Sequence, residues 1–264
     1  MQVISSKENE IIKKIKKLKD KKYRDLENKF IVEGIKIIRE AIVEKANIDK
    51  IIVCEECINN GNINKELLYE IAKFNCIYVT EKVFQTLTDV VTHQGILAII
   101  EKQSSVTEID YKEDIIVVLD GIQDPGNLGT ILRTVDSVGL KQIILSEDTT
   151  DSYNPKVVRS TMGAIFRLNI IETKNLKEVL KEMKKHKFEV VSTSLETNDN
   201  IYDIDYNRKV LVIGNEANGV SKEILDLSNR KIKIPMIGKT ESLNVSVATS
   251  IVLYEYVRQK INKN

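Results

Sequence analysis

Apolar residues follow two spacings along the first part of the chain, one typical of strands and one typical of helices. Short apolar runs at 51–53, 76–79 and 95–100 predict strands, and the segments at 64–75 and 81–88 have helical spacing. Strands that alternate with helices predict an α/β unit.

A second α/β series follows the polar segment 102–114, which carries no sustained apolar period and is the best candidate for a linker. The strands expected in this series are 115–119, 142–145, 168–171, 190–193, 210–213 and 231–235, and the helices are 128–138, 155–163, 176–186 and 242–260. The run Ile115–Leu119 is continuously apolar, as in a buried parallel strand. We therefore expect an α/β fold with domains at 1–105 and 112–264.

The N-terminal segment predicts a basic helix. Ser5 followed by Glu8 resembles a capping box, so a helix is expected over about 7–20. Its apolar face would comprise Ile11, Ile15 and Leu18.

Residues 1–29 hold ten Lys and Arg against five acids, a stripe that can neutralise phosphates. A solvated helix face in a lysine-rich protein is an equally good explanation before other observations are added. The candidate phosphate contacts are Lys13, Lys14, Lys17, Lys21 and Arg24.

Composition limits the protein class. Hydrophobic residues make up 42% and charged residues 30%, which argues against a disordered chain. No apolar run has the length of a membrane span and no secretory signal is visible, so we expect a cytoplasmic protein without a membrane partner.

The cysteines do not predict a metal site. Cys54 and Cys57 have C-x-x-C spacing, but Cys76 is the one other thiol, and the histidines, His93 and His186, show no ligand pattern. We expect ordinary thiols, as in a reducing cytoplasm, and no metal.

Three loops of the second series could carry chemistry, because each follows an apolar strand and ligands of parallel sheets bind beyond the carboxyl ends of strands. In the first, Asn127 stands where a helix N-cap is wanted, and Arg133 is either partly exposed or bound to an anion. In the second, Gly214 and Gly219 flank Glu216, and such glycines permit close approach of a ligand. The chain has no G-x-G-x-x-G fingerprint after an apolar strand, which disfavours a nicotinamide or flavin enzyme.

The third loop leads into the last helix, expected to start at Ser242. The first turns of that helix are polar, with Asn244 and Ser246 among them. These residues could cap the helix or bind a ligand.

In this order and spacing the three loops resemble the motifs of the SpoU (TrmH-type) RNA ribose methyltransferases of the SPOUT superfamily. The matching residues are Asn127, Gly129 and Arg133, then Gly214, Glu216 and Gly219, then Ile234, Pro235 and Ser242–Ala248. The first domain resembles the family's substrate-binding domain, a smaller α/β fold like that of a ribosomal protein, through Phe30–Gly34 and His93–Ile96.

The resemblance implies a parallel-sheet domain with a deep trefoil knot, whose loops bind S-adenosylmethionine, and an active site at a homodimer interface. By similarity, the residues that would bind the cofactor are Thr193, Gly214, Asn215, Ile234, Ser242 and Leu243.

The implied reaction is methyl transfer to a ribose 2′-hydroxyl, with Arg133, Asn127, Glu216 and Asn244 as catalytic residues. Because a guanidinium is costly to deprotonate, we expect Arg133 to grip an RNA phosphate and stabilise the alkoxide. Glu216 or a water would take the proton, and Asn127 and Asn244 would orient the reactants. Large-subunit ribosomal RNA is the expected substrate; transfer RNA, or a catalytically silent assembly factor, are the alternatives.

Overall fold

The computed structural model describes residues 3–103 and 108–263, which form two compact units. The first unit combines the described N-terminal residues, up to 103, with Tyr153–Phe166. The second contains residues 108–152 and the chain from Arg167 onward. A segment in the middle of the second α/β series is therefore part of the first unit.

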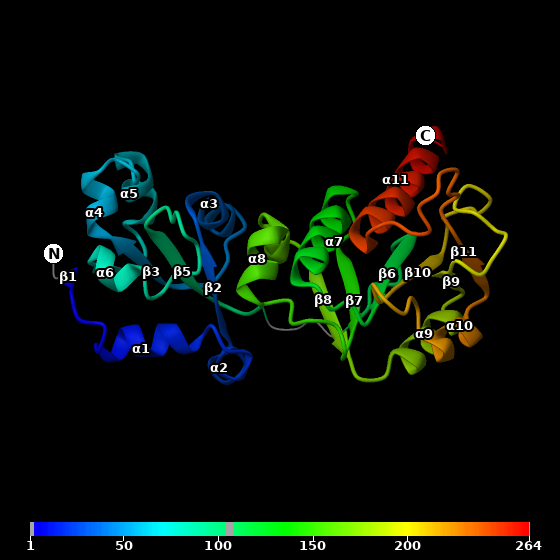
Figure 1. Ribbon diagram of the computed structural model, residues 1–264, viewed down its shortest axis with the longest axis horizontal. Coiled ribbons are helices and arrows are strands. Elements are labelled where there is room, and N and C mark those ends of the chain that lie inside the picture. The colour runs from blue at the N-terminus through cyan, green and yellow to red at the C-terminus, as the bar shows by residue number, and fades with distance from the viewer. Residues whose placement is uncertain (1–2, 104–107, 264) are drawn as a thin grey trace. The chain divides into compact units, whose positions relative to one another are not determined.

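The first unit is built on a mixed sheet, which among the described residues has the strand order β1-β4-β3-β5-β2 (Figure 1). The pairs β1–β4 and β3–β4 are parallel, whereas β5 is antiparallel to both β2 and β3. The strands are β1 (Val3–Ile4), β2 (Lys29–Glu33), β3 (Ile48–Cys54), β4 (Cys76–Val79) and β5 (Ile96–Glu101). The helices are α1 (Glu10–Lys17), α2 (Lys21–Glu27), α3 (Ile35–Val43), α4 (Glu55–Asn59), α5 (Lys65–Ile71), α6 (Glu81–Phe84), α8 (Pro155–Thr161) and the 3-10 helix η1 (Ala164–Phe166).

The basic N-terminal segment forms two helices in place of the single helix predicted over 7–20. The side chain of Asn9 caps α1, where the sequence had suggested a Ser5–Glu8 box, and Asp20 starts α2 by accepting a hydrogen bond from the Lys22 N–H. The buried face also differs, because Ile12 points into the core, whereas Ile11 is 40% exposed.

The second unit is built on a sheet whose described strands are all parallel, in the order β11-β9-β10-β6-β7-β8 (Figure 1). The strands are β6 (Ile115–Asp120), β7 (Gln142–Ser146), β8 (Asn169–Thr173), β9 (Glu189–Thr193), β10 (Lys209–Gly214) and β11 (Arg230–Ile232). The helices are α7 (Pro125–Ser137), α9 (Leu176–Lys185), α10 (Lys222–Leu227) and α11 (Val245–Lys263). The predicted α/β class and parallel second sheet are confirmed.

Helices cover both faces of this parallel sheet, which explains why its central strands β6 and β10 are apolar over most of their length. Ile116 and Val118 of β6 belong to one buried cluster with Leu180 of α9 and Ile224 of α10. On the other face α11 lies beside α7 (Figure 1).

The direction of the sheet reverses between β6 and β10. From β6 the chain proceeds outward through β7 to β8, and then crosses back to form β9 and β10 on the other side of β6. In open parallel sheets such a reversal opens a crevice at the carboxyl ends of the two central strands, where ligands bind. The fold therefore places a candidate site at the loops after β6 and β10.

None of the described helices is both long enough and apolar enough to cross a bilayer.

Arg24 corrects one prediction for the basic segment. Its side chain is 2% exposed, and Nη1 donates hydrogen bonds to the carbonyl oxygens of Leu18 and Lys19, at 2.9 and 2.7 Å. Arg24 thus donates to main-chain carbonyl groups just after the end of α1, and its guanidinium is not available to an RNA phosphate. The prediction of RNA contact by Arg24 is wrong, because its charge is used inside the fold.

Replacing Arg24 with alanine should lower the free energy of unfolding by about 1–3 kcal/mol, since it leaves buried carbonyl groups without donors. Urea denaturation would measure the change. The matched control is Lys14→Ala on the exposed face of α1, which should change stability by no more than about 0.5 kcal/mol. Equal stability of the two variants would contradict a structural role for Arg24.

Candidate active site

The predicted site residues on the strands lie at one edge of the parallel sheet. Gly214, the last residue of β10, is in register with Asp120, the last residue of β6. Thr193 ends β9 and is in register with Ile232 of β11. The loops that follow these strands therefore meet above the reversal point.

The helix that follows β6 begins earlier than the sequence suggested. Asp124 is the N-cap of α7, and its carboxylate accepts a hydrogen bond from the Asn127 N–H at 2.9 Å. Pro125 is the first helical residue, a position that its fixed φ favours. The prediction that Asn127 caps this helix is wrong, and its side chain is left to bond other loops.

The loop after β10 is a tight turn closed by its own main chain. Asn215 and Gly219 exchange two backbone hydrogen bonds of 2.9 Å. The Asn215 amide group donates to the Gly121 carbonyl at 2.7 Å, and its Oδ1 accepts from the N–H groups of Ala217 and Asn218. The polar groups of Asn215 are thus engaged in holding the turn.

Gly214 is required by the close approach of this turn. A Cβ atom at Gly214 would lie 2.0 Å from the carbonyl carbon of Gly219 and 2.0 Å from the Val220 nitrogen. Neither backbone atom can yield without opening the turn.

Glu216 connects the two central loops. Its carboxylate accepts hydrogen bonds from the Gln123 and Asp124 N–H groups, at 3.1 and 3.2 Å, and from the Asn127 side-chain amide at 3.0 Å. Burial opposes ionisation, but these donors outweigh it, and the pKa of Glu216 lies below its ordinary value. Glu216 is therefore ionised, and both of its carboxylate oxygens accept hydrogen bonds from the loop after β6.

Asn244 connects the third loop, which leads into α11, to Asn127. Its amide group donates to Asn127 Oδ1 at 2.9 Å, and its own Oδ1 accepts from the Ser246 N–H and hydroxyl. Asn244 thereby caps α11, which begins at Val245 and not at the predicted Ser242. Glu216, Asn127 and Asn244 form a continuous hydrogen-bonded chain across the three loops.

Arg133 does not belong to the hydrogen-bonded series of Glu216, Asn127 and Asn244. It lies six residues after Asn127 on α7, about 9 Å along the helix axis and about 120° around it. Its side chain is exposed, and among the described residues no hydrogen bond or ion pair holds its guanidinium. The structure therefore leaves Arg133 free to contact a ligand or another chain.

The remaining predicted cofactor residues lie on the segment between β11 and α11. Its start is fixed by backbone hydrogen bonds of 3.0 Å that join Lys233 to Asp199 and Ile201. Ile234 and Leu243 are half-buried, and Ser242 is exposed.

Two site residues had not been singled out from the sequence. Asp120 accepts a hydrogen bond from the Ser221 N–H at 2.8 Å, and so fixes the start of α10 to the end of β6. Gln123 contributes the backbone N–H that bonds Glu216. Asp120, an acid directly after a buried strand, is a signal that could have been used; the role of Gln123 depends only on loop conformation.

Comparison with known proteins gives two family matches. The model of the SpoU rRNA Methylase family matches residues 114–254, and that of the MRM3-like substrate binding domain matches residues 9–98.

Two curated relatives are similar over most of their length. The 23S rRNA (guanosine(2553)-2′-O)-methyltransferase RlmP of Bacillus subtilis is 32% identical over 255 residues, which cover 96% of this chain and 98% of that protein. The 23S rRNA (guanosine-2′-O-)-methyltransferase RlmB of Xylella fastidiosa is 34% identical, over 83% of this chain and 94% of its own.

Solved structures agree with these matches. A crystal structure of an RNA 2′-O ribose methyltransferase aligns with a TM-score of 0.85 and 28% identity, covering 98% of this chain and 100% of that one. An AdoMet-bound rRNA methyltransferase from Sinorhizobium meliloti aligns with a TM-score of 0.83 and 30% identity, covering 98% of both chains.

Proposed function

Since the chain belongs to the SpoU rRNA methylase family, we propose that it transfers a methyl group from S-adenosylmethionine to the ribose 2′-hydroxyl of a guanosine in 23S ribosomal RNA. The proposed substrate is supported above all by the match to RlmP, which spans 96% of this chain. Family membership confirms the resemblance drawn from the three loops. We propose the cytoplasm as the compartment, in keeping with three free thiols.

The edge of the sheet fits S-adenosylmethionine. The half-buried side chains of Ile234 and Leu243 offer apolar surface, and the turns at Thr193 and Gly214 offer main-chain groups. Ser242 and Asn215 complete the proposed lining, Asn215 by shaping the turn. When bound, the cofactor supplies an electrophilic methyl group on a good leaving group, so orientation carries much of the rate enhancement.

The hydrogen-bonded chain supports separate roles for its members. Asn127 and Asn244 orient the reactants, because each is held by the other and by a further partner. Glu216 is a positioning residue, since its two oxygens already accept hydrogen bonds and its lowered pKa makes it a weak base. A water molecule is the better proton acceptor.

Arg133 supplies the positive charge that the proposed reaction needs. We assign it to gripping an RNA phosphate and stabilising the developing alkoxide, as a cation and not as a base. Its distance from Asn127 along α7 suits a guanidinium that serves the site of a partner subunit.

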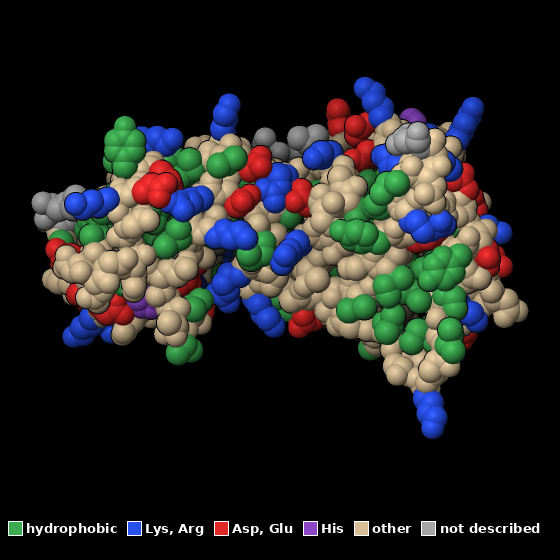
Figure 2. Space-filling view, turned by 90° about the horizontal axis from the view of Figure 1, so that it is seen from above, with side chains coloured by type: hydrophobic (Ala, Val, Ile, Leu, Met, Phe, Trp, Pro, Cys, Tyr) green, Lys and Arg blue, Asp and Glu red, His purple; other side chains and the backbone are tan. Residues whose placement is uncertain are grey.

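A homodimer accounts for apolar side chains left exposed on the second unit. Val247, Tyr254 and Ile261 recur every seven residues on α11 and are 48, 54 and 67% exposed. Figure 2 shows hydrophobic side chains gathered on the side of this unit that carries α11. A second copy of the chain covering this stripe would bury it and place Arg133 near the partner's loops.

We also propose that the chain is knotted at the cofactor site. The segment after β9 bonds Lys233 on one side, and on the other the Ile204 carbonyl accepts a hydrogen bond from Gln259 of α11 at 2.9 Å. The loop after β9 therefore contacts both the residue that follows β11 and helix α11, which supports threading.

The first domain, residues 1–105, is proposed to hold the RNA, and residues 112–264 to carry out the transfer. Lys13 and Lys21 are exposed but form ion pairs with acids nearby in the sequence, whereas Lys14 and Lys17 are exposed without an acidic partner among the described residues. All four are proposed phosphate contacts.

Replacing Lys14 and Lys17 together with alanine should weaken RNA binding and flatten its salt dependence. If each contacts one phosphate of a single-stranded region, the slope of log K against log salt should fall by about 1.4. Fluorescence anisotropy at several salt concentrations would measure it. The control replaces Lys181 and Lys185 on α9, where the same charge is lost and the slope should stay unchanged; equal slopes in both variants would exclude a local RNA contact by α1.

The function is tested by incubating the full chain with tritiated S-adenosylmethionine and unmodified 23S ribosomal RNA, followed by mass mapping of the labelled nucleotide. A single 2′-O-methylguanosine is expected. Transfer RNA is the parallel substrate, and label found there alone would refute the ribosomal assignment. Cofactor binding without transfer to either RNA would indicate a silent assembly factor.

A further inference from the structure

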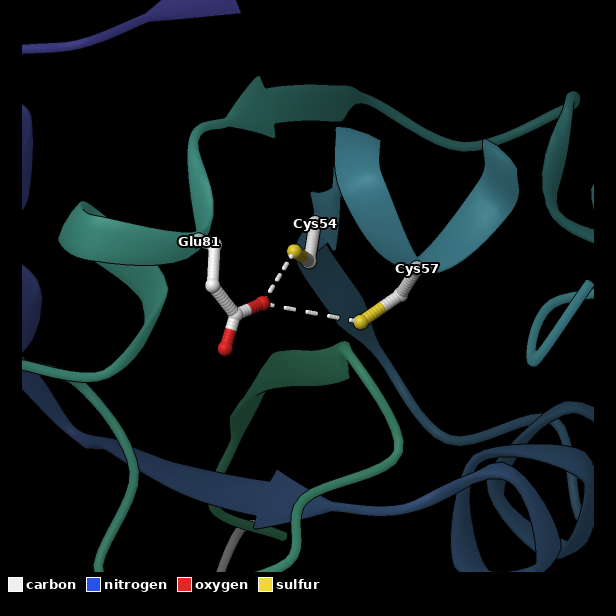
Figure 3. A group of neighbouring side chains, drawn as sticks. All are labelled: Cys54, Cys57 and Glu81. Atoms are coloured by element: carbon white, nitrogen blue, oxygen red, sulfur yellow. Dashed lines mark hydrogen bonds between the residues drawn. The ribbon is translucent and has the colours of Figure 1, made fainter. Parts of the chain in front are cut away.

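Two cysteines and a glutamate of the first unit converge on one another (Figure 3). Cys54 is the last residue of β3, Cys57 lies on α4, and Glu81 begins α6, two residues after the end of β4. Because β3 and β4 are parallel, their carboxyl ends bring these residues to one edge. The two sulfur atoms and a carboxylate oxygen all lie within 4.8 Å of one another.

The carboxylate is held between the thiols and a histidine. Glu81 Oε2 lies 2.9 Å from Cys54 Sγ and 3.7 Å from Cys57 Sγ, and Glu81 Oε1 lies 2.8 Å from His93 Nε2. The His93 side chain is 8% exposed, and its Nδ1 is buried without a hydrogen-bond partner among the described residues.

The surrounding backbone is shaped to admit the two thiols. Gly95 has a φ of +76°, and a Cβ there would lie 2.3 Å from Cys57 Cβ and 2.4 Å from its Sγ. Glu56 holds Glu81 in place, because its carboxylate accepts a hydrogen bond from the Glu81 N–H at 2.8 Å. The three donor atoms therefore converge in a built site, not on flexible surface side chains.

The chemistry of the three groups suits a cation. Both thiols are buried, and one carboxylate oxygen of Glu81 lies against both sulfur atoms. A divalent ion stabilises thiolates and a carboxylate together.

We propose that Cys54, Cys57 and Glu81 bind a zinc ion, with His93 orienting the Glu81 ligand through its other oxygen. Zinc prefers four ligands of this type at tetrahedral corners. Two sulfurs at about 2.3 Å from zinc stand about 3.8 Å apart, so the present arrangement closes around the ion with small movements. Binding replaces the two thiol protons, which pass to solvent, and Glu81 is already ionised. Water takes the fourth position, through the side where Glu81 is 34% exposed.

Such an ion would fasten elements that the sheet alone does not join. It would connect the end of β3, α4 and the start of α6, and through His93 the turn before β5. The proposal does not depend on methyl transfer, and neither result decides the other.

The experiment uses the full chain, purified without a metal-affinity step and stripped with chelator under a non-thiol reductant. Titration with Co²⁺ should produce the visible absorption of a tetrahedral thiolate site at one ion per chain, and Zn²⁺ should abolish that absorption at one equivalent. This measurement needs no variant. Wild-type protein that binds neither ion stoichiometrically would overturn the proposal.

Cysteine variants locate the site. Cys54→Ser and Cys57→Ser should each weaken Zn²⁺ binding at least about 100-fold, since each removes a thiolate ligand. Cys76→Ser is the matched control, because its thiol bonds the Ile71 carbonyl away from the cluster, and it should bind as wild type. His93→Asn should weaken binding about 10-fold to 100-fold, as loss of a ligand's orienting partner does.

Two results of this series would overturn the assignment. One is loss of binding in Cys76→Ser equal to that in Cys54→Ser. The other is a Cys54–Cys57 disulfide, seen by mass spectrometry, that persists under reductant and excludes zinc. Circular dichroism of each variant would verify that the fold is retained.

Discussion

Replacing Arg133 with alanine should lower the rate of methyl transfer at least about 100-fold and leave S-adenosylmethionine affinity unchanged. The size follows from removing one charged group aimed at a developing oxyanion, which costs about 10²- to 10³-fold. Cofactor affinity should be unaffected, because Arg133 lies apart from the chain formed by Glu216, Asn127 and Asn244. Single-turnover transfer and calorimetry would measure the two quantities separately.

The lysine variant separates charge from geometry. Arg133→Lys keeps a cation but loses the planar fork that binds a phosphate through two parallel hydrogen bonds, so its rate should fall between alanine and wild type. Full turnover by this variant would exclude a bidentate role.

Mixing two inactive variants tests whether Arg133 acts on the partner's site. Chains carrying Arg133→Ala would supply an intact cofactor site, and chains carrying a cofactor-site change would supply Arg133. A mixed dimer should recover activity if the two sites are shared across the interface. No recovery in a mixture shown to exchange subunits would place Arg133 and the cofactor site in the same subunit.

The positions of the site loops could be predicted because they depend on periodicity. Apolar strands such as Ile115–Leu119 mark where a buried parallel strand ends, and the residues that follow must lie at the ligand-binding edge. The partners of Asn127 could not be predicted in the same way. Asp124 and Asn127 are both good N-cap residues, and Pro125 decided between them.

Arg24 shows where composition misleads. A basic residue in a lysine-rich stripe is expected to face solvent, and its neighbours Lys14 and Lys17 do so. Arg24 is buried because α1 ends at Lys17, and this break leaves the carbonyl groups of Leu18 and Lys19 to accept hydrogen bonds from its guanidinium. The break depends on Asp20 starting a new helix, which the apolar spacing alone did not reveal.

Contacts between distant segments were equally hidden from the sequence. The segment Tyr153–Phe166 follows β7 but belongs to the first unit, where Tyr153 packs on Phe30 with ring centroids 4.8 Å apart. Cys54 and Cys57 had no visible partner in the sequence, because Glu81 reaches them only through the pairing of β3 with β4. Both associations arise from tertiary contacts between distant segments, which local sequence patterns do not reveal.

Gly214→Ala should reduce S-adenosylmethionine affinity about 100-fold or more. The added Cβ would lie 2.0 Å from two backbone atoms, at Gly219 and Val220, so the turn after β10 has to open. Opening breaks the paired hydrogen bonds between Asn215 and Gly219 and displaces Glu216 from Asn127. Overpacking of this kind costs about 3 kcal/mol, and about 1.4 kcal/mol corresponds to a tenfold loss of affinity.

Gly219→Ala is the matched control, because it changes the same turn without a clash. Gly219 has a φ of +69° and no atom within 4 Å of its Cβ position, so alanine there meets backbone strain alone, about 1–2 kcal/mol. Its cofactor affinity should stay within about tenfold of wild type, and calorimetry with circular dichroism would measure affinity and folding together. If Gly214→Ala bound the cofactor as well as Gly219→Ala does, the close approach at Gly214 would have no part in forming the site. The proposal that this turn holds the methyl donor would then fail, whatever the variant's stability.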